Sequence, residues 1–116
     1  MGMQIQHLQE NLGFRQDWNK NKKSFLSNVK LAALDDGIEI VLISTPPEHR
    51  GTKAASKAMQ FLINIADKHN TTLFLSPDAL GGGKNGAMSQ SKLEQWYARL
   101  GFEPIESNLY WARKPQ

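Results

Sequence analysis

The sequence predicts one α/β domain with a mixed sheet (an α+β arrangement), built around a strand-helix-strand unit. Two apolar runs joined by Asp36-Gly37 predict a hairpin, and a strongly periodic helix over about residues 52–70 follows it. A short apolar run at 72–76 comes next. A strand, a helix and a second strand in this order predict a parallel pair of strands with the helix on one face.

Length and composition favour a single folded domain. The 116 residues suffice for one modest core, and 40% hydrophobic with 22% charged residues is typical of globular chains. We therefore expect residues 1–116 to form one domain. Cysteine is absent, which excludes disulfides, thiolate catalysis and cysteine metal sites. No metal site is expected, because the three histidines are widely scattered: His7, His49 and His69.

The chain has the features of a soluble, cytoplasmic protein. Its amino terminus lacks a charged segment followed by an apolar run, and no stretch approaches the length of a membrane span. The net charge of +3 and the pI near 9.3 suit an anionic small molecule as well as nucleic acid. The densest basic group, Lys20 with Lys22 and Lys23, has no interleaved aromatic residues, so it predicts a solvated loop rather than a nucleic-acid surface.

The first part of the chain carries the weakest structural signal. Met3, Ile5, Leu8 and Leu12 stand among polar residues, a pattern compatible with a short amphipathic helix or with a strand. Residues 13–23 combine a glycine, two asparagines and three lysines, which predicts a connecting loop. No function is assigned to this part of the sequence.

The hairpin and the helix after it carry stronger signals. The second hairpin arm, residues 38–43, is apolar on both faces near its end, as expected of a central strand, and Pro46-Pro47 stops it. Over residues 52–70, apolar residues recur at helical spacing and predict one buried stripe. Its members are Ala55, Ala58, Met59, Leu62, Ile65 and Ala66.

A long glycine-rich segment, 77–89, separates the predicted parallel strands from the last elements, and we interpret it as a lid or hinge. It contains GxGxxG at 81–86, but no helix follows directly and the chain is too short for a dinucleotide-binding fold. A helix then begins with Ser91-Lys92-Leu93-Glu94, which fits a capping box, and ends before Gly101, a C-cap glycine. A last strand is expected at about 109–113.

The segment 44–56 joins the predicted central strand to a helix start. Free N–H groups at a helix start, together with the helix dipole, form an anion site that suits a pyrophosphate. Arg50 and Lys53 would add positive charge. The segment is equally compatible with an ordinary strand-to-helix turn whose basic residues are solvated, so it does not decide the function by itself.

A second segment, 93–102, places Tyr97 one helical turn before Gly101-Phe102. Together the two segments resemble the GNAT family of N-acetyltransferases, over roughly residues 38–113. In that family a loop of pattern Arg/Gln-x-x-Gly-x-Gly/Ala follows a strand, and a later helix ends in Tyr-x-x-x-Gly-Phe. The resemblance implies the GNAT-like fold, acetyl-CoA as co-substrate, and transfer of its acetyl group to a primary amine.

The resemblance also implies a coenzyme A site along the strand end, the loop and the helix start. Arg50 opens the loop pattern, Ala55 fills its small-residue place, and Gln90 stands where many relatives carry an asparagine. Lys53 replaces the usual glycine, where its side chain would either crowd the phosphate or contact it. The implied cofactor-binding residues are Ile43, Ser44, Thr45, Arg50, Gly51, Thr52, Lys53, Ala54, Ala55 and Gln90, of which the first three would line the pantetheine arm with main-chain groups.

For the reaction, the resemblance implies direct attack of the amine on the thioester, without a covalent enzyme intermediate. Thr45 would donate a main-chain hydrogen bond to the developing oxyanion, and Tyr97 would protonate the departing thiolate. Tyr97 is also compatible with simple core packing. Relatives often carry a carboxylate base where this chain has Ser76. The remaining candidates for the base are an ordered water, Glu39, Glu48, His49 and Asp78.

Three functions stay compatible with the sequence. The first is an active N-acetyltransferase for a small-molecule or protein amine. The second is a coenzyme A-binding module without turnover, since relatives build the acceptor pocket from elements before the central strand and only a short segment precedes it here. The third, a basic nucleic-acid-binding domain, is disfavoured by the charge pattern. A homodimer that completes the acceptor pocket is also compatible, and the acceptor and the acyl length stay open.

Overall fold

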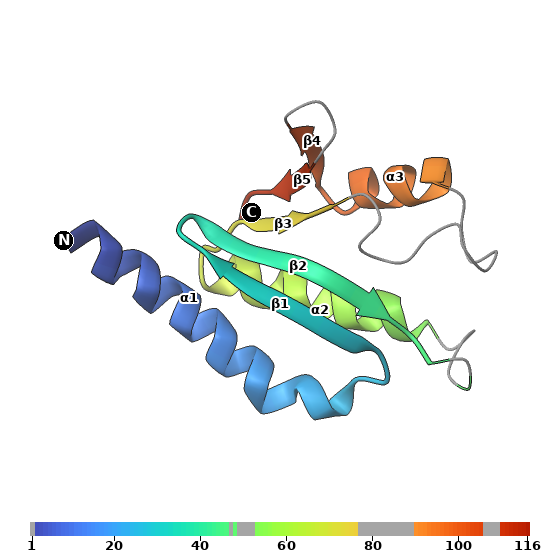
Figure 1. The fold of residues 1–116 in the computed structure, drawn as a ribbon, viewed down its shortest axis with the longest axis horizontal. Helices are drawn as coiled ribbons and strands as arrows, with labels where there is room; N and C mark the ends of the chain where they lie inside the picture. The colour runs from blue at the N-terminus through green and yellow to red at the C-terminus, as the bar shows by residue number, and fades with distance from the viewer. Residues whose placement is uncertain (1, 47, 49–52, 77–89, 106–109) are drawn as a thin grey trace.

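Figure 1 shows the computed structural model, which describes residues 2–46, 48, 53–76, 90–105 and 110–116. Within these residues the protein is an α+β domain with a mixed sheet, as predicted; the sheet has five strands, and three α-helices accompany it. In chain order the elements are α1 Gly2–Asn21, a short 3-10 helix η1 Lys22–Ser24, β1 Asn28–Leu34, β2 Gly37–Ser44, α2 Ala54–Lys68, β3 Leu73–Leu75, α3 Gln90–Arg99, β4 Glu103–Ile105 and β5 Tyr110–Arg113.

β1 and β2 form the predicted antiparallel hairpin, with Leu34 opposite Gly37. The turn therefore consists of the two aspartates between them, and Gly37 belongs to the strand rather than to the turn. A Cβ atom on Gly37 would collide with the carbonyl oxygen of Thr72. The next residue, Ile38, donates its N–H to that same oxygen at 3.0 Å. Glycine at this position lets β2 approach the start of β3 closely enough to pair.

The strands β2 and β3 pair in parallel, and α2 connects them, which confirms the predicted strand-helix-strand unit. Ile38 lies opposite Leu73, and Ile40 lies opposite Leu75. The buried residues of α2 recur at the predicted helical spacing. They are Ala54, Ala58, Met59, Leu62, Ile63, Ile65 and Ala66.

The sheet is completed by β5 and β4, in the order β1-β2-β3-β5-β4. The predicted last strand is present as β5, antiparallel to β3. The short strand β4 was not predicted, because its three residues include Pro104 and are all exposed, so they show no alternation. The helix α3 was predicted, but it begins at Gln90, so Ser91 lies inside its first turn and is not the N-cap.

The buried side chains gather on one face of the sheet. Arg113 of β5 lies on this face and bonds to α2, and Trp111 contacts the ring of Tyr97 on α3. The core therefore lies between this face and the helices. The sheet residues on this face are Ile38, Ile40, Ile43, Leu73, Leu75, Trp111 and Arg113.

The amino-terminal helix differs from the prediction. α1 continues without a break into η1, so the predicted loop over residues 13–23 was wrong. Phe14 and Trp18 lie four residues apart and are both buried. The ring of Trp18 stacks on Phe25 at 5.6 Å and contacts Phe61 of α2 at 6.1 Å between centroids. Packing of one face outweighs the weak helix propensity of the segment.

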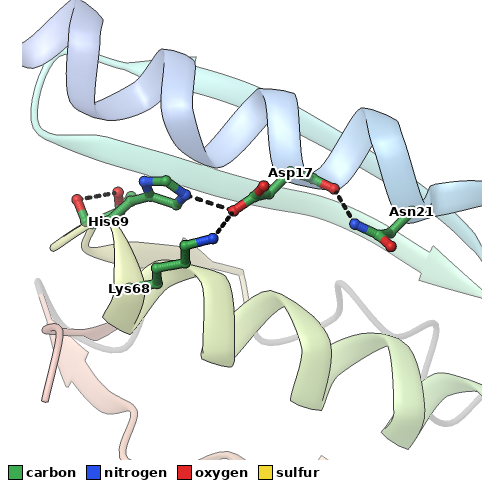
Figure 2. A network of polar contacts seen from close by, with 5 residues as sticks. Asp17, Asn21, Lys68 and His69 are labelled. Carbon is green, nitrogen blue, oxygen red and sulfur yellow. Dashed lines mark hydrogen bonds and ion pairs between the residues drawn. The ribbon is translucent and has the colours of Figure 1, made fainter.

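Polar contacts join α1 to the end of α2 (Figure 2). The Oδ2 atom of Asp17 accepts hydrogen bonds from His69 Nε2 at 2.7 Å and Lys68 Nζ at 3.2 Å. The bond from His69, followed by that from Lys68, lowers the pKa of Asp17 below its ordinary value. These contacts fix the C-terminal part of α1 to the end of α2.

Candidate functional site

The candidate site begins where the two parallel strands separate. β3 ends at Leu75, opposite Ile40, whereas β2 continues to Ser44 (Figure 1). Beyond Ile40, residues 42–44 pair with β1 on their other side. On the side of β3, no strand of the described residues pairs with them. The end of β2 therefore presents main-chain groups that the sheet itself does not use.

A β-bulge lies where the strands separate. Lys30 lies opposite Leu42 and Leu31 lies opposite Ile40, so Val41 is the extra residue of β2. A bulge of one residue reverses the alternation of inward and outward side chains beyond it. Past this point, the residues of β2 that face the core have odd rather than even numbers.

Ile43 shows the consequence of the bulge, since it is only 1% exposed and continues the buried face that Ile38 begins. Ile38 donates its N–H to the carbonyl of Thr72 across the edge that β2 shares with β3. Residues with side chains on one face of a strand direct their main-chain groups to the same edge. Ile43 therefore directs its N–H and C=O to this edge, past the end of β3.

The start of α2 forms the second part of the site. Lys53 is the N-cap residue, with φ 62° and ψ 27°, and it makes no side-chain capping hydrogen bond. The first helical bond runs from the N–H of Lys57 to the carbonyl of Lys53. The N–H groups of the first turn consequently have no partner within the helix. No acidic residue lies in that turn, so an anion would meet the positive end of the helix dipole.

Lys53 has a left-handed conformation, which glycine adopts without strain. A non-glycine residue in this conformation costs about 1 kcal/mol. The preceding residues of the pattern, Arg50, Gly51 and Thr52, lie outside the described residues. The following residues, Ala54 and Ala55, are buried and half-buried at the helix start.

A small cavity of about 90 Å³ lies beside the start of α2. Residues 24–26, which line it, directly precede Ser27, whose hydroxyl contacts that of Thr45 just after β2. The basic residues Lys22 and Lys23 of η1 immediately precede this segment. The cavity is lined by Ser24, Phe25, Leu26, Ala54 and Lys57.

Thr45 follows β2 and is held by a side-chain contact. Its hydroxyl oxygen lies 2.8 Å from that of Ser27, and the two groups share a hydrogen bond. Ser27 is buried and Thr45 is half-buried, so this bond is partly shielded from water. Because the hydroxyl of Thr45 is engaged in this way, a role in oxyanion stabilisation rests on its main-chain N–H.

Tyr97 of α3 is fully buried. Its ring lies against three aromatic rings, with centroid distances of 6.0 Å to Trp96, 6.2 Å to Phe102 and 5.9 Å to Trp111. It belongs to the same buried cluster as Ile43. The core packing that the sequence left open for Tyr97 is therefore present, whereas the acid role stays a prediction.

The pattern around Tyr97 also has a structural cause. The N–H of Phe102 bonds to the carbonyl of Tyr97, the N–H of Gly101 bonds to that of Ala98, and Gly101 has φ 100°. These bonds define a Schellman motif, whose usual apolar contact is supplied here by the rings of Tyr97 and Phe102. This confirms the predicted C-cap glycine.

The other predicted residues are dispersed. Glu48 is exposed, and Glu39 is half-buried on the sheet face opposite to Ile38 and Ile40. Gln90 is the first residue of α3. The segment 77–89, with Asp78, and the residue His49 lie outside the described residues.

Two residues of this region were not predicted. Ser27 carries no sequence signal, because its partner Thr45 lies 18 positions away and is recognised only in space. Trp111 was predicted within the last strand, but the sequence does not show that its indole Nε1 is buried without a hydrogen-bond partner, as it is among the described residues.

Comparison of the chain with protein-family models, curated proteins and solved structures finds no match. In the described part of the chain, no cluster of three or more histidine, aspartate or glutamate residues is arranged to hold a metal ion. None of the described helices has both the length and the apolar character needed to cross a membrane.

Proposed function

We propose that the protein is an N-acetyltransferase with a GNAT-like core, which moves an acetyl group from acetyl-CoA to a primary amine. The observation that carries the proposal is the separation of β2 from β3 after Ile40 and Leu75, on the way to the uncapped start of α2 at Lys53. A strand edge that no described strand covers and a helix start, in this order along the chain, suit a ligand with an amide-bearing arm and a diphosphate.

In this proposal the pantetheine arm of coenzyme A lies along the end of β2. Its amide groups exchange hydrogen bonds with main-chain groups of Ile43 and Thr45, as an added strand would, whereas Ser44 directs its main-chain groups toward β1. The diphosphate accepts hydrogen bonds from N–H groups at the start of α2. Arg50 and Lys53 add positive charge next to it.

The acceptor amine attacks the thioester carbon, and a C–N bond forms while the C–S bond breaks. The amine loses one proton and the departing thiolate gains one, so the products are an N-acetyl amine and the free thiol of coenzyme A. The main-chain N–H of Thr45 stabilises the oxyanion, and Tyr97 supplies the proton to sulfur. A water or a nearby carboxylate takes the proton of the amine. The acceptor is a small molecule or a protein amine, and the cytoplasm is the proposed compartment.

A second candidate function is coenzyme A binding without turnover. The observation that favours it is the complete burial of Tyr97 among three aromatic rings, which describes a packing residue as well as an acid. The strand edge and helix start would then bind the coenzyme without an acid at the sulfur.

Release of thiol from acetyl-CoA across a panel of amines tests the proposal, with Tyr97→Phe as the key variant. We expect Tyr97→Phe to lower kcat at least tenfold, and Tyr110→Phe, which alters an exposed tyrosine of β5, to leave it unchanged. A rise in melting temperature with coenzyme A, but no thiol release with any amine, would favour the second candidate. If millimolar coenzyme A or acetyl-CoA causes no thermal shift and no thiol is released, both candidate functions are ruled out.

The location of the phosphates is tested by charge reversal. Lys57→Glu alters a residue that lines the cavity beside the start of α2 and should weaken coenzyme A binding about tenfold. Lys30→Glu, on an exposed position of β1, is the matched control and should bind as the unaltered chain does. Equal weakening in both variants would indicate general charge attraction rather than a site.

A further inference from the structure

The indole N–H of Trp111 is a buried hydrogen-bond donor without an acceptor. Trp111 is 7% exposed, its Nε1 atom is covered, and no described residue accepts a hydrogen bond from it. Most buried polar groups have a partner, and a group that has none requires an explanation. A bound ligand that brings its own acceptor is one such explanation.

Trp111 lies at the last pair of residues before β2 and β3 separate. It is opposite Leu75 in the sheet, and Leu75 is opposite Ile40. All three side chains are buried, on the face that packs against the helices. The ring of Trp111 lies 5.9 Å from that of Tyr97 between centroids. The unpaired N–H thus belongs to the same buried cluster as Ile43 and the proposed proton donor.

The chemistry of the group limits what it can bind. An indole N–H donates one hydrogen bond and accepts none, so it serves neither as a base nor as a metal ligand. Its sheet partner Leu75 and its ring neighbour Tyr97 belong to an apolar cluster. The nearest cation on β5, Arg113, is already paired with Asp67 at 2.7 Å. A neutral carbonyl oxygen suits such surroundings better than an anion, which would lose its hydration.

We infer that Trp111 Nε1–H donates a hydrogen bond to a carbonyl oxygen of the bound acyl-pantetheine arm. This inference rests on the proposed function and adds a positioning residue that the loop and helix patterns do not contain. The carbonyl belongs either to the transferred acyl group or to a pantetheine amide, and the two sources can be separated. Coenzyme A carries only the amides, and acetyl-CoA carries both.

The first test follows the indole N–H of the three tryptophans in the ¹⁵N-labelled chain by NMR. Trp18→Phe and Trp96→Phe identify the other two signals, so that the Trp111 signal is read in the unaltered chain. We expect it to move downfield when acetyl-CoA is added. The same movement with coenzyme A assigns the bond to a pantetheine amide, whereas movement with acetyl-CoA alone assigns it to the acyl carbonyl.

The second test compares affinities. Trp111→Phe removes the N–H and keeps an aromatic ring, and it should raise the Kd for the ligand about tenfold, which equals about 1.4 kcal/mol. Trp96→Phe is the matched control, because Trp96 also contacts Tyr97, at 6.0 Å between centroids, and its Kd should stay unchanged. If Trp111→Phe does not fold, the indole N–H signal of Trp111 in the unaltered chain still tests the inference.

The outcomes distinguish this inference from the proposed function. If the ligand shifts main-chain signals of β2 and α2 while the Trp111 signal and the Trp111→Phe affinity stay unchanged, the inference is overturned and the proposed function stands. If neither coenzyme A nor acetyl-CoA binds the unaltered chain, both are overturned.

Discussion

His69 lies with its Nε2 atom 2.7 Å from Oδ2 of Asp17, and this contact ties the end of α2 to the C-terminal part of α1 (Figure 2). The contact depends on the absence of a side chain at Gly13. A Cβ atom there would lie 2.7 Å from His69 Nδ1. A glycine within a helix normally lowers its stability, so its place here is explained by the imidazole that packs against it.

This relationship predicts coupling between Gly13 and His69. In an isolated helix, Gly→Ala stabilises by about 1 kcal/mol. We expect Gly13→Ala to lose this gain in the unaltered chain, because the imidazole must leave Asp17, and to regain it in the His69→Ala background. Urea unfolding of the four variants in a double-mutant cycle measures the coupling. The same gain in both backgrounds would show that the ring moves aside freely.

A second ion pair makes stability depend on pH. Arg113 is 6% exposed in its side chain and donates to Asp67 Oδ1 at 2.7 Å and to the carbonyl of Leu100 at 2.8 Å. The hydrogen bond from Arg113 is the largest cause that lowers the pKa of Asp67 below the ordinary 3.8. A lowered folded-state pKa stabilises the fold above pH 3.8, and this contribution is lost as the pH falls through the lowered pKa.

Asp67→Asn should therefore destabilise the protein by about 2 kcal/mol at neutral pH, since it leaves the buried guanidinium without its counter-charge. The difference from the unaltered chain should shrink as the pH falls below about 4. Urea unfolding between pH 7 and about pH 2.5 measures it. Asp36→Asn, in the exposed hairpin turn, is the control and should change stability little at any of these pH values. A stability difference between Asp67→Asn and the unaltered chain that stays constant with pH would contradict the lowered pKa of Asp67.

The central part of the fold could be predicted because its signals are local. The Asp-Gly turn signal and the helical spacing over 52–70 depend on neighbours in the sequence, and both led to the observed elements. α1 could not be predicted in full, because Phe14 and Trp18 form its buried face only by packing against residues such as Phe61, far away in the sequence. Its own composition, with Gly13 in the middle, resembles that of a loop.

Some features of the candidate site could likewise be predicted from local sequence signals, and others could not. The strand end and the helix start on either side of the loop were predicted from local signals and are present. Lys53 has a left-handed conformation that suits the glycine of the loop pattern, while the pattern itself stays a prediction. The Tyr-x-x-x-Gly-Phe pattern is accounted for by the Schellman motif and its contact between Tyr97 and Phe102. Such a pattern indicates how a helix ends, whatever the function. Trp111 could not be singled out, because the absence of a partner is a property of the folded cluster.

The close approach of Gly37 to β3 predicts a large effect of a single methyl group. Gly37→Ala would place Cβ against the carbonyl oxygen of Thr72, and this main-chain atom also accepts the N–H of Ile38. We expect a loss of about 2 kcal/mol, as for other overpacked sites. Urea unfolding measures the loss, with Ala33→Ser, at an exposed position of β1, as a control expected within about 0.5 kcal/mol of the unaltered chain. Equal stability of Gly37→Ala would mean that the strands can separate there without cost.

Lys53 allows backbone strain and charge to be separated at the helix start. Lys53→Ala removes the charge and keeps the left-handed strain, whereas Lys53→Gly removes both, since φ 62° suits glycine. Lys53→Gly should therefore be more stable than Lys53→Ala by about 0.5–1 kcal/mol in urea unfolding. Equal stability of the two variants would show that the left-handed conformation of residue 53 carries no strain.

The affinities of the same variants for coenzyme A show what the Lys53 side chain does. If its ammonium group contacts a phosphate, both variants bind coenzyme A more weakly, with a shallower salt dependence. If the side chain crowds the phosphate, Lys53→Gly binds more tightly than the unaltered chain, because the helix start is then open to the ligand.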